Sequence, residues 1–172
     1  MNGVVVWFTG LPSSGKSTLA ERVAEALRSE GRRDVCVLDG DAVRAAVMPR
    51  WGYDDASRDH FYDSLSALAA MLATQGLAVM VPATAHREAY RARARARAPR
   101  FIEVYVRTDA DVAKARDAKG LYAAQREGAT THLPGADAGY EAPTSPDVVA
   151  EGGRDDDALA RVLALVLSSL AP

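Results

Sequence analysis

The sequence predicts a three-layer α/β domain with a mostly parallel sheet, because apolar runs of strand length alternate with longer helical patterns. The runs are continuous rather than alternating, which is typical of parallel strands that are covered on both faces. Parallel strands need crossover connections, and the segments between the runs have the length and periodicity of helices. The chain has 172 residues, 48% of them hydrophobic. This length suits one domain over residues 1–172 with a core of its own.

Four segments are predicted as strands. Each is short and rich in β-branched, aromatic or other apolar residues, and the first stops at a glycine. They cover residues 4–9, 35–38, 77–81 and 101–106.

Four further segments are predicted as helices. Residues 16–29 place apolar side chains on one face and charged side chains on the other, and apolar residues recur at helical spacing over 61–72, before Gly76. The threonine and aspartate of 108–111 have the spacing of a capping box, which predicts a helix start there. Three aspartates at 155–157 suit the N-terminus of a last helix.

Residues 117–146 interrupt this alternation. They contain seven glycines and prolines among scattered charges, which is too irregular for a core and too long for an ordinary connection. We expect a lid or binding loop over this range.

The alternating arginines at 91, 93, 95 and 97 resemble a low-complexity run. Residues two apart on a helix lie roughly 200° apart, so these side chains point in different directions and form no stripe. We predict a solvated helix, with nucleic-acid binding as the less favoured alternative.

Composition excludes several classes of function. The net charge of −2 gives no overall attraction to nucleic acid or anionic membranes, and the single cysteine, Cys36, excludes an internal disulfide and a cysteine-based zinc site. The first residues lack the pattern of a signal peptide, and no apolar run approaches the ~18 residues of a membrane helix. We expect a cytoplasmic protein without nucleic-acid or membrane partners.

The stretch GLPSSGKST fits G-x-x-x-x-G-K-[ST] and lies between a predicted strand and a predicted helix. Gly10 and Gly15 let the backbone N–H groups turn toward an anion, Lys16 reaches the β- and γ-phosphates, and Ser17 offers a hydroxyl to Mg²⁺. The motif therefore predicts that the protein binds a nucleoside triphosphate such as ATP, together with Mg²⁺. The expected nucleotide-binding residues are Gly10, Leu11, Pro12, Ser13, Ser14, Gly15, Lys16, Ser17 and Thr18.

In the stretch VLDGDAVR, two acids, Asp39 and Asp41, follow the end of the second predicted strand. Residues two apart in an extended strand project to the same face, so both carboxylates are expected to face the triphosphate. There they could hold the magnesium ion or accept a proton from an attacking hydroxyl. The alternative is a turn whose aspartates cap a helix. Arg44 is then available either for an anionic acceptor or for a surface salt bridge.

Several stretches, taken in order, resemble the adenylyl sulfate kinases, which phosphorylate the 3′-hydroxyl of adenosine 5′-phosphosulfate. The resemblance covers almost the whole chain, with a gap at 82–86, and implies a P-loop kinase fold, ATP and Mg²⁺, and a lid around 119–128. Members of the family often form dimers, so a homodimer is a candidate assembly. The stretches are VVVWFTGLPSSGKST, VLDGDAVR, GYDDASR, FIEVYVRTDADVAKARDAKGLYAAQREG and YEAP.

The resemblance also implies roles for single residues. It places Asp39 and Asp41 at the metal and the acceptor hydroxyl, Arg44 and Arg58 at the phosphosulfate, and Tyr53 where a phenylalanine stacks on adenine. The expected catalytic residues are Asp39, Asp41 and Lys16, and the expected metal ligands are Ser17 and Asp39.

Two residues of ARDAKGLY, Arg116 and Lys119, are expected to bring positive charge onto the transferring phosphoryl group. The alternative is a solvated helix end. The histidines at 60, 86 and 132 have no metal-site spacing, and we expect surface or loop roles for them.

The chain departs from the family on the acceptor side. Phe61, Tyr62, Asp63 and Ser64 stand where the family has asparagine, isoleucine and two arginines, and Leu133 stands where it has a phenylalanine that covers the adenine. Residues 83–87 read ATAHR in place of FISPHR. Two alternatives to adenosine 5′-phosphosulfate phosphorylation therefore stay open: a kinase for another nucleotide-linked or small anionic alcohol, and a non-catalytic nucleotide-binding protein.

Overall fold

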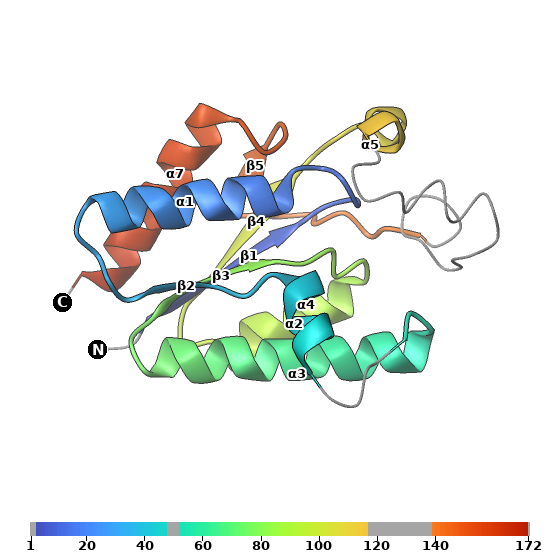
Figure 1. Ribbon diagram of the computed structural model, residues 1–172, viewed down its shortest axis with the longest axis horizontal. Coiled ribbons are helices and arrows are strands. Elements are labelled where there is room, and N and C mark those ends of the chain that lie inside the picture. Colours follow the sequence, from blue (N-terminus) through green and yellow to red (C-terminus); the bar gives the residue numbers. More distant parts are fainter. Residues whose placement is uncertain (1–2, 48–51, 117–138, 172) are drawn as a thin grey trace.

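A computed structural model describes residues 3–47, 52–116 and 139–171. Over these residues it contains a five-stranded sheet in the order β2-β3-β1-β4-β5, and every neighbouring pair is parallel. The predicted α/β class and parallel sheet are confirmed (Figure 1). The strands are β1 (Val4–Thr9), β2 (Val35–Val37), β3 (Ala78–Pro82), β4 (Phe101–Val106) and β5 (Val148–Ala150).

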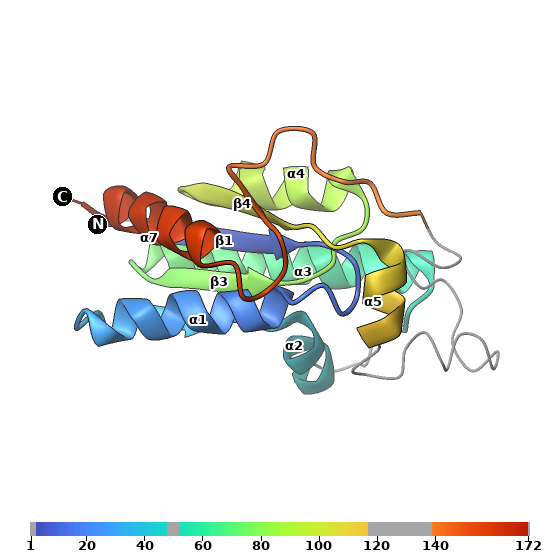
Figure 2. The same cartoon turned by 90° about the horizontal axis from the view of Figure 1, so that it is seen from above.

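Helices cover both faces of the sheet, as Figures 1 and 2 show. One face packs against α1 (Lys16–Ser29) and α7 (Asp156–Leu170), the other against α3 (Asp55–Thr74) and α4 (Glu88–Arg97). Two short helices, α2 (Gly40–Ala46) and α5 (Ala110–Arg116), lie at the carboxyl end of the strands. None of the helices in the described residues combines the length and hydropathy needed to cross a bilayer.

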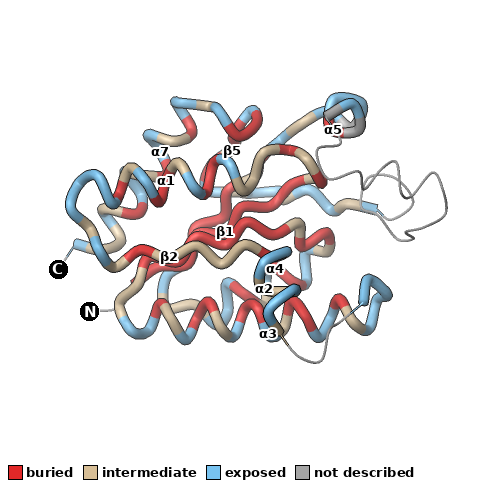
Figure 3. Tube along the Cα trace, in the orientation of Figure 1, coloured by how far each residue is buried: buried red, intermediate tan, exposed pale blue. Residues whose placement is uncertain are grey.

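The central strand β1 explains why the apolar runs are continuous. Val4, Val6 and Phe8 belong to the core under α1 and α7, whereas Val5 and Trp7 belong to the core under α3 and α4. All five are buried (Figure 3), since a strand between two helical layers has no solvent-facing side.

Most predicted elements are present, with small shifts at their ends. β1, β4 and α1 have the predicted bounds, β2 is one residue shorter, and β3 is displaced by one residue. α3 begins six residues before the predicted range, and Asp155 caps α7 through the N–H of Ala158. β5 and α2 were not predicted.

The predicted capping box at α5 is wrong. The Thr108 hydroxyl shares its one proton between the carbonyl oxygens of Arg107 at 2.8 Å and Ser14 at 3.3 Å. The N–H of Asp111 donates instead to Asp109, at 2.8 Å. Thr108 thereby connects the end of β4 to the loop that follows β1.

The prediction of a solvated arginine helix is wrong for Arg91 of α4. Its side chain is only 3% exposed and pairs with Glu103 of β4 at 2.8 Å. The other three arginines are partly exposed and pair with acids of neighbouring elements: Arg93 with Asp59 and Asp63, Arg95 with Glu103 and Asp147, and Arg97 with Asp63.

Candidate active site

The loop between β1 and α1 has the geometry that the phosphate-binding motif requires. Gly15 has φ 99°, and a Cβ there would lie 2.5 Å from the backbone nitrogen of Gly153. A Cβ on Gly10 would collide with the carbonyl oxygen of Val106. Only glycine fits these two positions, and the loop leads directly into the N-terminus of α1, where N–H groups favour an anion.

Side chains of the same loop are arranged for an anion. The Lys16 ammonium donates to the carbonyl oxygens of Leu11 at 2.7 Å and Gly10 at 3.1 Å, which holds it over the loop. The Ser13 and Ser14 hydroxyls are buried and have no hydrogen-bond partner within the described residues. A triphosphate would supply acceptors for such donors, so the loop fits the predicted nucleotide. Thr18 completes the first turn of α1.

Ser17 and Asp39 form the polar pair beside this loop. The Ser17 hydroxyl donates to Oδ2 of Asp39 at 2.7 Å, across 22 positions of sequence. A hydroxyl and a carboxylate oxygen next to a phosphate site are the ligand types that Mg²⁺ takes. No group of three or more histidine, cysteine or acidic side chains able to hold a metal occurs in the described part of the chain. Within the described residues, Ser17 and Asp39 are the predicted metal ligands, and the structure places them in contact with each other.

The premise that Asp39 and Asp41 share an extended strand is wrong. β2 ends at Val37, and Asp39 is the N-cap of α2, with φ −63° and ψ 126°. Its Oδ1 accepts the N–H groups of Asp41 at 3.0 Å and Ala42 at 3.1 Å, while its Oδ2 holds Ser17. The helix-capping alternative is thus correct for Asp39, and it coexists with the contact to the phosphate loop. Asp41 lies exposed in the first turn of α2.

Three residues expected to bind the phosphoryl-accepting substrate, Arg44, Tyr53 and Arg58, lie close together. Arg44 donates to the carbonyl oxygen of Gly52 at 2.7 Å, and its Cζ lies 4.8 Å from the ring centroid of Tyr53 and 3.8 Å from that of Phe61. Arg58 donates from Nε to the Tyr53 carbonyl oxygen at 2.7 Å. Tyr53 is 50% exposed, so its ring is accessible. Burial lowers the pKa of Arg44, although an arginine stays charged near neutral pH.

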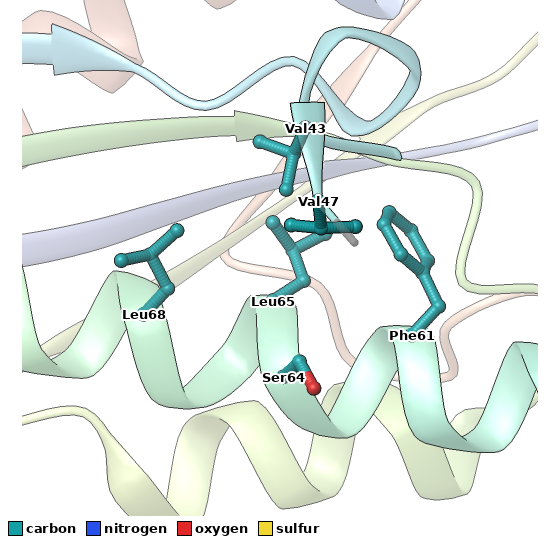
Figure 4. A pocket seen from close by; sticks show the side chains of 6 residues that line it. All are labelled: Val43, Val47, Phe61, Ser64, Leu65 and Leu68. Carbon is teal, nitrogen blue, oxygen red and sulfur yellow. The ribbon is translucent and has the colours of Figure 1, made fainter. Parts of the chain in front are cut away.

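An apolar cavity of about 230 Å³ lies beside this cluster, between α2 and α3. In Figure 4 the valines of α2 and its C-cap face the side chains that α3 projects toward them. Phe61 belongs to both the cavity wall and the contact with Arg44, so it connects the two. The lining residues are Val43, Val47, Phe61, Ser64, Leu65 and Leu68.

Of the predicted surface or loop role, only the surface part is wrong for His86: it lies in the loop between β3 and α4, but it is only 4% exposed. Its Nδ1 lies 3.4 Å from Nη1 of Arg58, and its ring meets Tyr90 edge to face at 5.6 Å. Burial, followed by the charges of Arg58 and Arg87, lowers the pKa of His86 to about 4. The ring is therefore neutral at physiological pH.

The other two histidines differ from His86. His60 is exposed on α3, as predicted, and His132 lies outside the described residues. The predictions for Lys119 and Leu133 also fall outside the described residues, as does most of the expected lid at 117–146. Arg116 is the last residue of α5 at the carboxyl end of the sheet.

Sequence reasoning missed the contacts of Tyr140 and Glu141 in YEAP. The Thr9 hydroxyl donates to the carbonyl oxygen of Thr84 at 2.6 Å, so it accepts its second bond, at 2.9 Å, from the Tyr140 hydroxyl. Glu141 donates its N–H to the His86 carbonyl oxygen. These contacts fasten the segment after residue 138 to the end of β1 and to the loop after β3.

Arg91 completes this attachment. It donates to the carbonyl oxygens of Ala85 and Glu141, each at 2.7 Å, in addition to its pair with Glu103. One signal in the sequence could have revealed it: an acid, Glu103, interrupts the apolar strand FIEVYV and needs a cationic partner when buried.

Comparisons with known proteins agree with this geometry. The family model for adenylylsulphate kinase matches residues 2–151. The adenylyl-sulfate kinase of Synechococcus sp. (strain JA-3-3Ab) is 39% identical over 168 residues, which are 98% of this chain and 94% of that protein. A probable bifunctional SAT/APS kinase 2 of Sorangium cellulosum (strain So ce56) is 39% identical over 166 residues, and this chain spans only 28% of its length.

Solved structures agree as well. The APS kinase CysC of Mycobacterium tuberculosis, in complex with AMPPNP and APS, superposes with a TM-score of 0.87 at 37% identity, covering 98% of this chain and 99% of that one. A sugar kinase from Janibacter sp. HTCC2649, at 20% identity and a TM-score of 0.64, shares the fold alone. The phosphate loop and the acidic N-cap of α2 are consistent with these matches, which cover nearly the whole chain. The chain belongs to the adenylylsulphate kinase family.

Proposed function

We propose that the chain is a kinase that transfers the γ-phosphoryl group of ATP to the 3′-hydroxyl of adenosine 5′-phosphosulfate, giving 3′-phosphoadenosine 5′-phosphosulfate and ADP. One observation carries the proposal. The phosphate loop with its Ser17–Asp39 pair and the cationic, aromatic cluster of Arg44, Tyr53 and Arg58 lie at the same end of the sheet. The relative from Mycobacterium tuberculosis, solved with AMPPNP and APS, supports the same pair of substrates.

One set of residues would bind ATP and Mg²⁺, and another would bind adenosine 5′-phosphosulfate. Lys16 and the loop N–H groups would hold the β- and γ-phosphates, and Ser17 and Asp39 would hold Mg²⁺, which neutralises charge on the phosphates when it is bound. Asp41, in the first turn of α2, would orient the acceptor hydroxyl and take its proton. Arg44 and Arg58 would hold the phosphosulfate, and Tyr53 would stack on the adenine.

A second candidate acceptor is another nucleotide-linked or small anionic alcohol. Asp63 pairs with Arg93 and Arg97 at 3.0 and 2.8 Å, so position 63 contributes no cation to the acceptor side. Phe61 places an aromatic face under Arg44 where the family usually has a polar side chain. These differences favour a comparison of acceptors over an assay with one substrate.

Several features remain predictions alongside this function. They are the single domain over residues 1–172, the lid at 117–146 with Arg116, Lys119 and Leu133 at the substrates, a homodimer, and a cytoplasmic location without nucleic-acid or membrane partners.

The test is an ADP-release assay with ATP, Mg²⁺ and a panel of acceptors that includes adenosine 5′-phosphosulfate. We expect turnover well above the water background with adenosine 5′-phosphosulfate, and a product phosphorylated at the 3′ position. If another acceptor were turned over and adenosine 5′-phosphosulfate were not, the proposed substrate would be wrong. An Asp39→Ala variant that binds ATP but loses turnover would exclude the non-catalytic alternative.

A further inference from the structure

Arg58 is held from two sides at the acceptor end of α3. Its side chain is buried, and Nε donates to the Tyr53 carbonyl oxygen at 2.7 Å. On the other side, Nη1 lies 3.4 Å from Nδ1 of His86, which comes from the loop between β3 and α4. The guanidinium is therefore fixed between a backbone oxygen and an imidazole nitrogen.

The direction of the second contact follows from chemistry. A guanidinium can only donate hydrogen bonds, so Nδ1 of His86 must be the acceptor and the ring proton must sit on Nε2. The buried ring is neutral, as its lowered pKa also indicates, and a protonated ring would place a second positive charge against Arg58.

His86 is itself firmly placed. Its carbonyl oxygen accepts the N–H of Glu141 at 2.8 Å, and its ring packs edge to face on Tyr90. The preceding residue, Ala85, has φ 40°, donates its N–H to the Tyr62 hydroxyl at 3.0 Å, and accepts a bond from Arg91 at 2.7 Å. A ring held this way cannot follow movements of Arg58, so it acts as a fixed acceptor.

We propose that His86 is a positioning residue for acceptor binding: its Nδ1 holds the Arg58 guanidinium in the orientation that receives the anionic group of the acceptor. The inference rests on the proposed function, in which Arg58 binds that anion. Fixing a guanidinium before binding reduces the side-chain entropy lost when the acceptor arrives. His86 itself has no contact with the reacting atoms in this proposal.

The test compares His86→Leu with His86→Asn. Asparagine can place its amide oxygen where Nδ1 lies, whereas leucine fills similar space without an acceptor. We expect His86→Leu to raise both the KM and the equilibrium Kd for adenosine 5′-phosphosulfate about five- to tenfold, the size of one lost hydrogen bond to a charged group. We expect the KM for ATP to change less than about twofold, and His86→Asn to restore most of the acceptor affinity.

Two further variants make the outcome decisive. His60→Leu, an exposed change on α3, should leave all constants unaltered. If His86→Leu does not fold, His86→Gln keeps a polar side chain with its oxygen nearer the Nε2 position, and should show the same rise in acceptor KM. Thermal unfolding of each variant shows which of them are folded.

The failures are distinguishable. If the wild-type protein neither binds nor turns over adenosine 5′-phosphosulfate, the proposed function and the inference both fail. If the wild type binds it and His86→Leu and His86→Gln bind it equally well, only the inference is overturned. A parallel loss of ATP and acceptor affinity that His86→Asn does not restore would likewise overturn it, because it would show a purely structural role.

Discussion

Asp39 accepts the Ser17 hydroxyl at 2.7 Å through one carboxylate oxygen and caps α2 through the other. The first turn of α1 and the start of α2 are thereby joined across the nucleotide site. A residue proposed to hold the metal is thus also a structural cap, and substitutions at this position separate the two roles.

Asp39→Asn should abolish most turnover while preserving the fold. Asparagine is as good an N-cap as aspartate, so we expect the free energy of unfolding to change by less than about 1 kcal/mol. The lost charge beside Ser17 should reduce kcat about 100-fold or more. Kinetics with saturating ATP and thermal unfolding measure the two effects, and a variant with wild-type kcat would contradict the assignment of Asp39 to the metal.

Asp39→Ala is the matched variant for the cap. It removes the acceptor for the N–H groups of Asp41 and Ala42, so we expect an additional loss of about 1 kcal/mol in the free energy of unfolding. ATP binding should stay nearly intact in both variants, because Lys16 and the loop backbone remain.

Gly153→Ala should impair nucleotide binding, although residue 153 lies far from the phosphate motif in sequence. A Cβ there would lie 2.6 Å from the carbonyl oxygen of Gly15 and 2.9 Å from Cβ of Thr18. Because the first contact is to backbone, the loop or the start of α1 must move. We expect the KM for ATP to rise about tenfold and the protein to lose about 1–3 kcal/mol of stability.

Gly31→Ala is the control for this change. Gly31 has φ 88° and open space around the Cβ position, so alanine costs about 1 kcal/mol of backbone strain without a collision. ATP kinetics should be unaltered. An equal KM increase in both variants would show that lost stability, and not the contact with Gly15, causes the effect.

The parts of the fold that could be predicted from sequence are those with long, regular patterns. β1, β4 and α1 have the predicted bounds because their apolar residues are numerous and follow one period. β5 has only three residues and follows the irregular range 117–146, so no strand pattern stands out there. α2 was not predicted because it begins only three residues after β2 ends, so the DGD of VLDGDAVR looks like a continuation of the extended strand.

Parts of the candidate site could likewise be predicted from sequence, and other parts could not. The phosphate loop is a local motif and could be placed by its own residues, whereas grouping Arg44, Tyr53 and Arg58 needed a family resemblance. The burial of His86 depends on how α3, α4 and the segment after residue 138 pack around it. No spacing within ATAHR contains that information.

Arg91→Met should destabilise the protein strongly. Its side chain is 3% exposed, and its guanidinium binds Glu103, Ala85 and Glu141, so its loss leaves a carboxylate and two carbonyl oxygens without these bonds. We expect a loss of about 3–5 kcal/mol in the free energy of unfolding, typical of removing one partner from a buried ion pair. Urea denaturation measures it.

Arg93→Met, two residues away on α4, is the comparison for this change. Arg93 pairs with Asp59 and Asp63 at 3.0 Å, but all three side chains are partly exposed. Exposed pairs contribute about 0–1 kcal/mol each, so the variant should lose far less stability than Arg91→Met. Similar losses in the two variants would contradict the special role of the buried pair.

Lowering the pH should destabilise the protein through His86. Its pKa is about 4 when folded and near its ordinary value of 6.5 when unfolded, because burial and the charges of Arg58 and Arg87 outweigh the favourable charges of Asp55 and Glu141. The unfolded chain then binds more protons than the folded protein between these values, so stability falls as the pH drops through this window. We expect His86 to account for about 2–3 kcal/mol between pH 7 and 4.5.

His86→Asn isolates this contribution, since it keeps an acceptor for Arg58 but cannot be protonated. Asp63 and Asp155 have lowered pKa values, so their stabilisation is lost as the pH falls further, toward and below the ordinary aspartate range, and equally in both proteins. The difference in free energy of unfolding between wild type and His86→Asn, followed by urea denaturation from pH 7 to 4.5, should therefore shift steadily in favour of the variant. A constant difference over this range would mean that His86 keeps an ordinary pKa, and that the imidazole is not held neutral against Arg58.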